Sequence, residues 1–273
     1  MAGKLRDAVY GAAVGDALGV PYEFQGREAF ECAGMVSGGT YGLPAGTFSD
    51  DTSMMLATCD SIRECGRVDV HDMRGRFEAW VRDGAYTADG VVFDVGNTVA
   101  TALAEGRGCD GVRSNGNGSL MRIAPLAFFD ASDDDVRAVS AVTHAHRLST
   151  ESCVCFVRLI RGVVGGASLE EALRGSIPGG DEFAFLADVA SRPRNEVPSS
   201  GYVLDTLGAA IWCFANTGSY ADCVLAAVNL GSDTDTTACV AGALAGAVYG
   251  YEAIPAGWLD ALRGKDVIDR CLF

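Results

Sequence analysis

Lysine and histidine are scarce in this chain of 273 residues. Two lysines, Lys4 and Lys265, stand against nineteen arginines (21 minus 2), so few lysines are available for catalysis. Positive charge is also outweighed, because the net charge is −15. Such an acidic chain argues against a nucleic-acid partner held through phosphate contacts, and it suits a cytosolic enzyme or a site that collects cations.

Other common signals are missing too. No stretch of about 18 apolar residues proposes a membrane span, and the start of the chain lacks the pattern of a signal peptide. The ten cysteines include no Cys-x-x-Cys pair, and Cys153 and Cys155 lie too far from other ligands to suggest zinc. We therefore expect a cytoplasmic protein with reduced thiols and no membrane partner.

No segment alternates between apolar and polar residues over six or more positions. Apolar residues instead recur every three or four positions in the segments 4–19, 52–64, 151–164, 203–215 and 236–249. This period predicts an all-α fold, arranged as a single compact multi-helix domain over residues 1–273. The connections 34–47 and 108–119 are too long to be simple links, which makes them candidates for function.

Two clusters of carboxylates each lead directly into a predicted helix. The first is Ser49-Asp50-Asp51, and its simplest interpretation is helix capping. The second, Asp233-Thr234-Asp235-Thr236, has more acids and hydroxyls than a cap requires. Carboxylate and hydroxyl oxygens are the ligands that Mg²⁺ or Mn²⁺ prefers. If the two helix starts converge, two such ions would relieve the repulsion between the acids.

Two further acids are placed informatively. Asp16 falls on the apolar face of the first predicted helix, so we expect it to be buried and paired, hydrogen-bonded or close to a metal. Glu23 follows the end of that helix between two aromatic residues. It is a candidate for the site, with an ordinary exposed loop glutamate as the alternative.

Six short segments together resemble the ADP-ribosylglycohydrolase family, which includes the dinitrogenase reductase-activating glycohydrolase. They occur in the family's order, at 15–19 with Glu23, 49–52, 94–98, 115–122, 143–146 and 231–236. The resemblance implies an all-α fold, a site for two Mg²⁺ or Mn²⁺ ions, and hydrolysis of the bond between ADP-ribose and a modified substrate. The family often has Gly-Gly-Asp where this chain has Ser232 before Asp233, outside the implied ligands.

The resemblance also implies roles for individual residues. The metal ligands would be Ser49, Asp50, Asp51, Asp233, Asp235 and Thr236. The substrate-binding residues would be Gly96, Asn97, Asn117, Gly118, Ser119, Met121 and His146. Asp94 and Asn97 match the string of members that cleave ADP-ribosyl-arginine. We therefore expect Asp94 to contact the guanidinium–ribose linkage and Glu23 to handle water or gate the metals, with the converse assignment as the alternative.

Several functional alternatives stay open at this point. The linkage could instead be to serine, a nucleobase or O-acetyl-ADP-ribose, or the chain could be a non-catalytic ADP-ribose-binding relative. A phosphoryl-transfer enzyme of the haloacid dehalogenase type is disfavoured, because Lys265 is the only lysine after the second cluster. We expect the partner to be an ADP-ribosylated protein or small molecule, and the enzyme to be a monomer.

Overall fold

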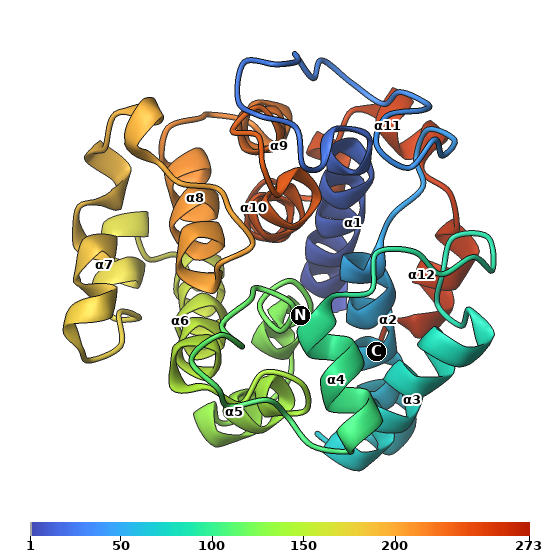
Figure 1. Cartoon of the computed structure of the whole chain (residues 1–273). Helices are drawn as coiled ribbons and strands as arrows, with labels where there is room; N and C mark the ends of the chain where they lie inside the picture. Colours follow the sequence, from blue (N-terminus) through green and yellow to red (C-terminus); the bar gives the residue numbers. More distant parts are fainter. Residues whose placement is uncertain (1) are drawn as a thin grey trace.

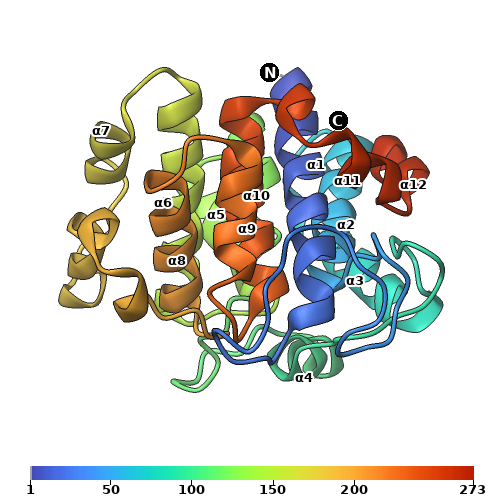
Figure 2. The same cartoon turned by 90° about the horizontal axis from the view of Figure 1, so that it is seen from above.

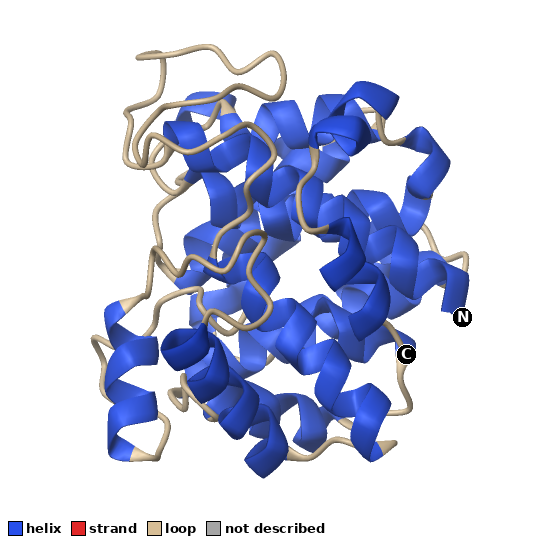
Figure 3. Cartoon of the chain, turned by 90° about the vertical axis from the view of Figure 1, so that its right-hand side faces the viewer, coloured by secondary structure: helices blue, strands red, loops and turns tan. Residues whose placement is uncertain are grey.

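Helices make up the regular structure of residues 2–273, which are the residues that the computed structural model describes (Figure 3). The α-helices are α1 (Ala2–Gly19), α2 (Asp50–Cys65), α3 (Val70–Asp83), α4 (Asn97–Glu105), α5 (Asp133–Ala141), α6 (Arg147–Val164), α7 (Leu169–Arg174), α8 (Val203–Ala215), α9 (Tyr220–Val228), α10 (Thr234–Tyr249), α11 (Ala256–Ala261) and α12 (Lys265–Cys271). Short 3-10 helices are η1 (Val20–Tyr22), η2 (Ala124–Phe128), η3 (Asp181–Ala187), η4 (Val189–Ser191), η5 (Arg194–Glu196) and η6 (Tyr251–Ala253). Residues 2–273 contain isolated β-bridges but no strand. The predicted all-α fold is confirmed.

Each of the five predicted helices is present, in α1, α2, α6, α8 and α10. Their ends follow local capping chemistry. The Ser49 side chain accepts a hydrogen bond from a backbone N–H at the start of α2, and Gly66 ends that helix in the left-handed conformation. Helix α6 begins at Arg147, before the apolar segment 151–164 that predicted it, because the ring of His146 caps it.

Helices α1 and α10 form the centre of the molecule and lie side by side in Figures 1 and 2. Small residues allow their backbones to approach closely. A Cβ atom added at Gly15 would lie 2.1 Å from the Ala238 carbonyl oxygen, and one added at Gly11 would lie 2.3 Å from that of Gly242. Only glycine fits such contacts, so these positions fix the distance between the two central helices.

The other helices surround this pair. Helices α8 and α9 pack against α10, α6 carries α5 and α7, and α2 lies between α1 and the pair α3 and α12. The long connections 23–49, 84–96 and 106–123 gather at one end of the bundle (Figures 2 and 3). The end of α1 and the starts of α2 and α10 meet there. None of the helices within residues 2–273 combines the length and apolarity that a membrane span requires.

Candidate active site

Asp16 joins the end of α1 to the start of α2. Its side chain is fully buried and accepts four hydrogen bonds, from the backbone N–H of Ser49 at 2.9 and 3.1 Å, from that of Thr52 at 3.0 Å, and from the Thr52 hydroxyl at 2.6 Å. The first N–H groups of a helix have no partner within the helix, so a carboxylate can bind them from outside. The prediction that Asp16 is buried and hydrogen-bonded is confirmed.

Asp51 lies on the first turn of α2 and is also fully buried. Its Oδ2 atom accepts hydrogen bonds from the Ser49 hydroxyl at 2.9 Å and from the Thr236 hydroxyl at 3.4 Å. Its Oδ1 atom is buried without a hydrogen-bond partner. A buried carboxylate oxygen without a donor is costly, which makes it available to a cation.

Both acids of the second cluster, at the start of α10, also have one carboxylate oxygen that is buried without a hydrogen-bond partner. Asp233 occupies the N-cap position, yet its side chain makes no capping hydrogen bond. Its Oδ2 atom accepts one from the Asn117 amide at 2.9 Å, while its Oδ1 atom is buried without a partner. Asp235 accepts one from the backbone N–H of Thr236, and its Oδ2 atom is likewise unpartnered. Capping therefore explains neither the Asp233 side chain nor the second oxygen of Asp235.

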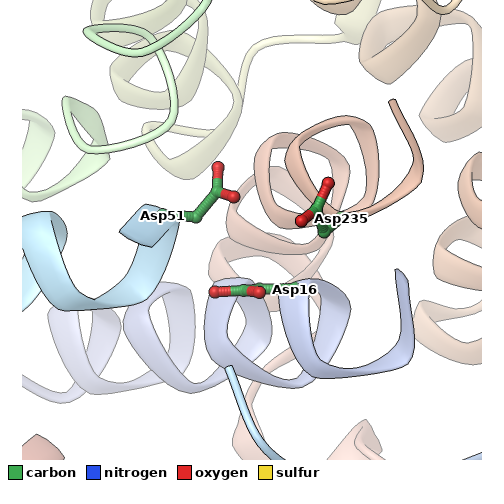
Figure 4. A group of neighbouring side chains, drawn as sticks. All are labelled: Asp16, Asp51 and Asp235. Carbon is green, nitrogen blue, oxygen red and sulfur yellow. The ribbon is translucent and has the colours of Figure 1, made fainter. Parts of the chain in front are cut away.

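The two carboxylate clusters meet in space, which the sequence alone left open. Carboxylate oxygens lie within 4.8 Å of one another in two groups, Asp16–Asp51–Asp235 and Glu23–Asp233–Asp235. Figure 4 shows the first group, whose three side chains approach from α1, α2 and α10. Asp235 belongs to both groups, and together the groups offer enough carboxylate oxygens to hold hard divalent cations.

Burial and mutual repulsion dominate the electrostatics of this cluster. Burial, followed by the neighbouring carboxylates, raises the pKa values of Asp50, Asp51 and Asp235 well above their usual range. Burial raises the pKa of Asp16 to about 6 against the hydrogen bonds that lower it. So many acids cannot all ionise side by side without compensating positive charge. The unpartnered oxygens and the crowding both match the needs of divalent cations.

A cavity of about 450 Å³ opens beside the cluster. Of the predicted site residues, the structure brings to its wall Glu23, Asp50, Asp94, Gly96, Asn97, Asn117, Gly118, Met121, Asp233 and Thr236. Ser49, Asp51 and Asp235 are buried and do not line the cavity. Asp51 and Asp235 belong to the carboxylate groups, and the Ser49 hydroxyl donates to Asp51. The volume suits a bound small molecule, with the carboxylate cluster as one of its walls.

Glu23 and Asp94 face the cavity from two different loops. Burial, and then the negative charge of Asp94, raises the pKa of Glu23 to about 8. Burial also raises the pKa of Asp94, whose backbone has a positive φ of 54°. Glu23 belongs to one of the carboxylate groups with Asp233 and Asp235, whereas Asp94 belongs to neither. Glu23 is therefore the closer of the two to Asp233 and Asp235.

His144 lines the cavity, whereas His146 does not. The Nδ1 atom of His146 accepts a hydrogen bond from the backbone N–H of Leu148 and caps α6, and its expected contact with substrate stays a prediction. His144 lies against the loop that contains Gly116 and Gly118, where a Cβ atom on Gly118 would be 2.8 Å from the imidazole Cε1. Burial, and then the charge of Arg122, lowers the pKa of His144 to about 3, so the ring is neutral at physiological pH.

Two other expected substrate contacts have structural roles. Ser119 is fully buried and accepts hydrogen bonds from Ser140 and Cys153, so it does not reach the cavity. Asn117 lines the cavity but also donates to Asp233, and so holds a member of the cluster. Arg113, which sequence reasoning missed, brings a positive charge to the same cavity. Only its place in the long connection 108–119 could have drawn attention to it.

Fold and site together define the class of this protein. The model of the ADP-ribosylglycohydrolase family matches residues 1–272, and the chain belongs to that family. A solved structure described as an ADP-ribosylglycohydrolase-related protein complex is similar with a TM-score of 0.82 at 32% sequence identity. The similarity covers 99% of this chain and 95% of that one.

Relatives narrow the class to an activity. The chain is 35% identical to an ADP-ribosylarginine hydrolase, Tri1, of Serratia proteamaculans, over 97% of this chain and 76% of the relative. It is 33% identical to the ADP-ribosyl-[dinitrogen reductase] glycohydrolase of Rhodospirillum rubrum, over 94% and 90%. The protein is therefore an enzyme, an ADP-ribosylglycohydrolase.

Proposed function

We propose that this enzyme hydrolyses the N-glycosidic bond between ADP-ribose and an arginine side chain of a protein, with two Mg²⁺ or Mn²⁺ ions at the carboxylate cluster. The observation that carries the proposal is the set of buried, unpartnered oxygens of Asp51, Asp233 and Asp235 beside a cavity. The names of the Serratia and Rhodospirillum relatives support the arginine linkage and the protein substrate, respectively.

The proposed ligands are Ser49, Asp50, Asp51, Asp233, Asp235 and Thr236. When bound, the ions would supply positive charge and Lewis acidity for the hydroxyl groups of the ribose next to the scissile bond. Asp16 already accepts four hydrogen bonds, so we assign it to orienting the start of α2. Asn117 would orient Asp233 in the same way through its amide.

Glu23 and Asp94 have separate roles in this proposal. Hydrolysis breaks the bond between the anomeric carbon and the guanidine nitrogen, and water supplies the hydroxyl group that replaces it. One proton of that water is lost at the anomeric carbon, and one proton is taken up by the nitrogen that leaves, so the arginine side chain departs as a guanidinium. Glu23 lies close to Asp233 and Asp235, so we assign it to the water that attacks the anomeric carbon. Asp94 lies outside both carboxylate groups, and we assign it to the guanidinium that leaves. Its negative charge would hold that cation by a charge-assisted hydrogen bond.

The remaining cavity would hold the rest of ADP-ribose. Gly116 and Gly118 bring backbone close to the cavity, as loops that bind phosphate require. Arg113 offers its positive charge to the diphosphate, and the neutral His144 offers a hydrogen bond. Substrate-binding roles for Gly96, Asn97 and Met121 are consistent with their places in the cavity wall.

A substrate panel tests the proposal. Release of ADP-ribose would be measured from peptides ADP-ribosylated on arginine or on serine, from an ADP-ribosylated nucleobase and from O-acetyl-ADP-ribose, with Mg²⁺, Mn²⁺ or a chelator. We expect the arginine linkage to be cleaved fastest and the chelator to abolish turnover. Faster cleavage of another linkage would refute the arginine assignment, and full activity in the chelator would refute the role of the ions.

A further inference from the structure

Tyr41 lies in the long connection between η1 and α2, and its hydroxyl donates a hydrogen bond of 2.6 Å to Oε2 of Glu23. Glu23 is only 5% exposed, although it belongs to a loop. A short hydrogen bond inside a buried site is strong, because the local dielectric constant is low. The hydroxyl thus fixes the direction in which the Glu23 side chain enters the site.

The segment that carries Tyr41 is itself fastened to the segment of Glu23. The Thr40 hydroxyl donates to the backbone carbonyl of Glu23 at 2.6 Å, and the Thr40 backbone N–H donates to that of Pro21 at 3.0 Å. Gly39 has a φ of 69°, and a Cβ atom there would lie 2.0 Å from the Pro21 carbonyl oxygen. Only glycine fits at such an approach, so the two segments meet in one close arrangement.

Tyr41 also reaches the loop of the second acid. Its ring packs against Phe93, with 5.0 Å between the ring centroids and an interplanar angle of 55°. Phe93 directly precedes Asp94, whose backbone has a positive φ. One side chain therefore touches Glu23 through its hydroxyl and the loop of Asp94 through its ring.

We propose that Tyr41 is a positioning residue for the hydrolysis, because its hydroxyl holds Glu23 and its ring supports the loop of Asp94 at the cavity. The inference rests on the proposed function, since Tyr41 acts through the two acids and does not itself line the cavity. Loss of the hydroxyl should disorder the Glu23 carboxylate and leave the bound ADP-ribose unaffected. The effect should therefore fall on kcat, with little change in KM.

The test is a double-mutant cycle with Tyr41→Phe and Glu23→Ala, measured on whichever ADP-ribosyl linkage the wild-type enzyme cleaves and with saturating Mn²⁺. We expect Tyr41→Phe to lower kcat about tenfold, which corresponds to about 1.4 kcal/mol, with KM within about twofold. In the Glu23→Ala background the same substitution should cause no further loss.

Tyr10→Phe is the matched control. The Tyr10 hydroxyl donates to Asp269 at 2.8 Å, so this substitution also removes a tyrosine–carboxylate hydrogen bond, but Tyr10 does not line the cavity. We expect its kcat to equal that of the wild type and its melting temperature to fall as much as that of Tyr41→Phe.

Three results would overturn the inference. One is a wild-type kcat for Tyr41→Phe while Glu23→Ala is impaired. Another is a tenfold loss that persists in the Glu23→Ala background. The third is a drop in melting temperature well beyond that of Tyr10→Phe together with weaker ADP-ribose binding, which would mark a structural support. Wild-type activity of Glu23→Ala would instead refute the proposed role of Glu23, so the two failures are distinguishable.

Discussion

Gly15 sets the distance between the helices that carry Asp16 and Asp235, so Gly15→Ala should damage the site from outside it. The added Cβ would lie 2.1 Å from the Ala238 carbonyl oxygen. An ordinary carbon–oxygen contact is about 3.3 Å, so α1 must move away from α10 by about 1 Å. Overpacking of this kind costs about 1–3 kcal/mol. A displacement of about 1 Å at catalytic groups lowers activity on the order of 10²-fold.

Gly75→Ala on α3 provides the control, because no atom lies within 4 Å of a Cβ there. Alanine is favoured over glycine in a helix by about 1 kcal/mol, so this variant should be slightly more stable and fully active. Melting temperature, Mn²⁺ affinity by isothermal titration calorimetry, and kcat/KM would be measured for both variants. Gly15→Ala with wild-type Mn²⁺ affinity and activity would refute the reasoning that the α1–α10 contact sets the geometry of the carboxylate cluster.

Three further outcomes are expected. First, the pKa of Glu23 in the folded protein, about 8, exceeds its value in the unfolded chain, and burial also raises the pKa values of Asp50, Asp51 and Asp235. Above about pH 4, these acids therefore bind more protons in the folded, metal-free protein than in the unfolded chain. The melting temperature of the metal-free protein should therefore fall as the pH rises from 7 to 8, above the range in which the buried, neutral His144 gives the opposite slope, and Mn²⁺ at about a hundred times its Kd should restore about 2.7 kcal/mol at pH 8; a rise with pH in the chelated protein would contradict this. Second, Asp16→Asn leaves one oxygen for the donors of α2 and should weaken Mn²⁺ binding about 10–100-fold, whereas Asp7→Asn at the other end of α1 should not. Third, His144→Ala should raise the KM by a factor that stays constant between pH 6 and 9, because the ring is neutral throughout; a factor that changes with pH would argue for an ionised ring.

Helix positions could be predicted from sequence where one face of the helix is apolar and the ends are capped. The apolar period of α6 predicted the helix but not where it begins. Its cap is His146, and histidine is an uncommon capping residue that the pattern does not reveal. Asp16 was expected to be buried because an acid on an apolar face faces the core, and it is. Its partners on α2 could not be predicted, because they depend on how two helices meet.

The residues around the cavity also depend on contacts between distant segments, which a local sequence pattern does not predict. Periodicity cannot say which histidine of the segment 143–146 lines a cavity, and in the structure it is His144, which lies against Gly118. Tyr41 had no local signal at all, because its role depends on contacts with Glu23 and Phe93, which lie 18 and 52 positions away. Residues that act through a distant partner are visible only when the loops are placed together.

The carboxylate cluster and the glycine contacts between α1 and α10 depend on each other. Bringing Asp16, Asp51 and Asp235 together costs free energy, because buried acids repel one another and lose hydration. Close helix packing through Gly11, Gly15 and Gly242 opposes this repulsion, since moving the helices apart would open voids in the core. We therefore expect the core, rather than a bound ion, to hold the cluster together. A preformed site of this kind should bind divalent cations without a large change in helix content, which circular dichroism with and without Mn²⁺ would detect.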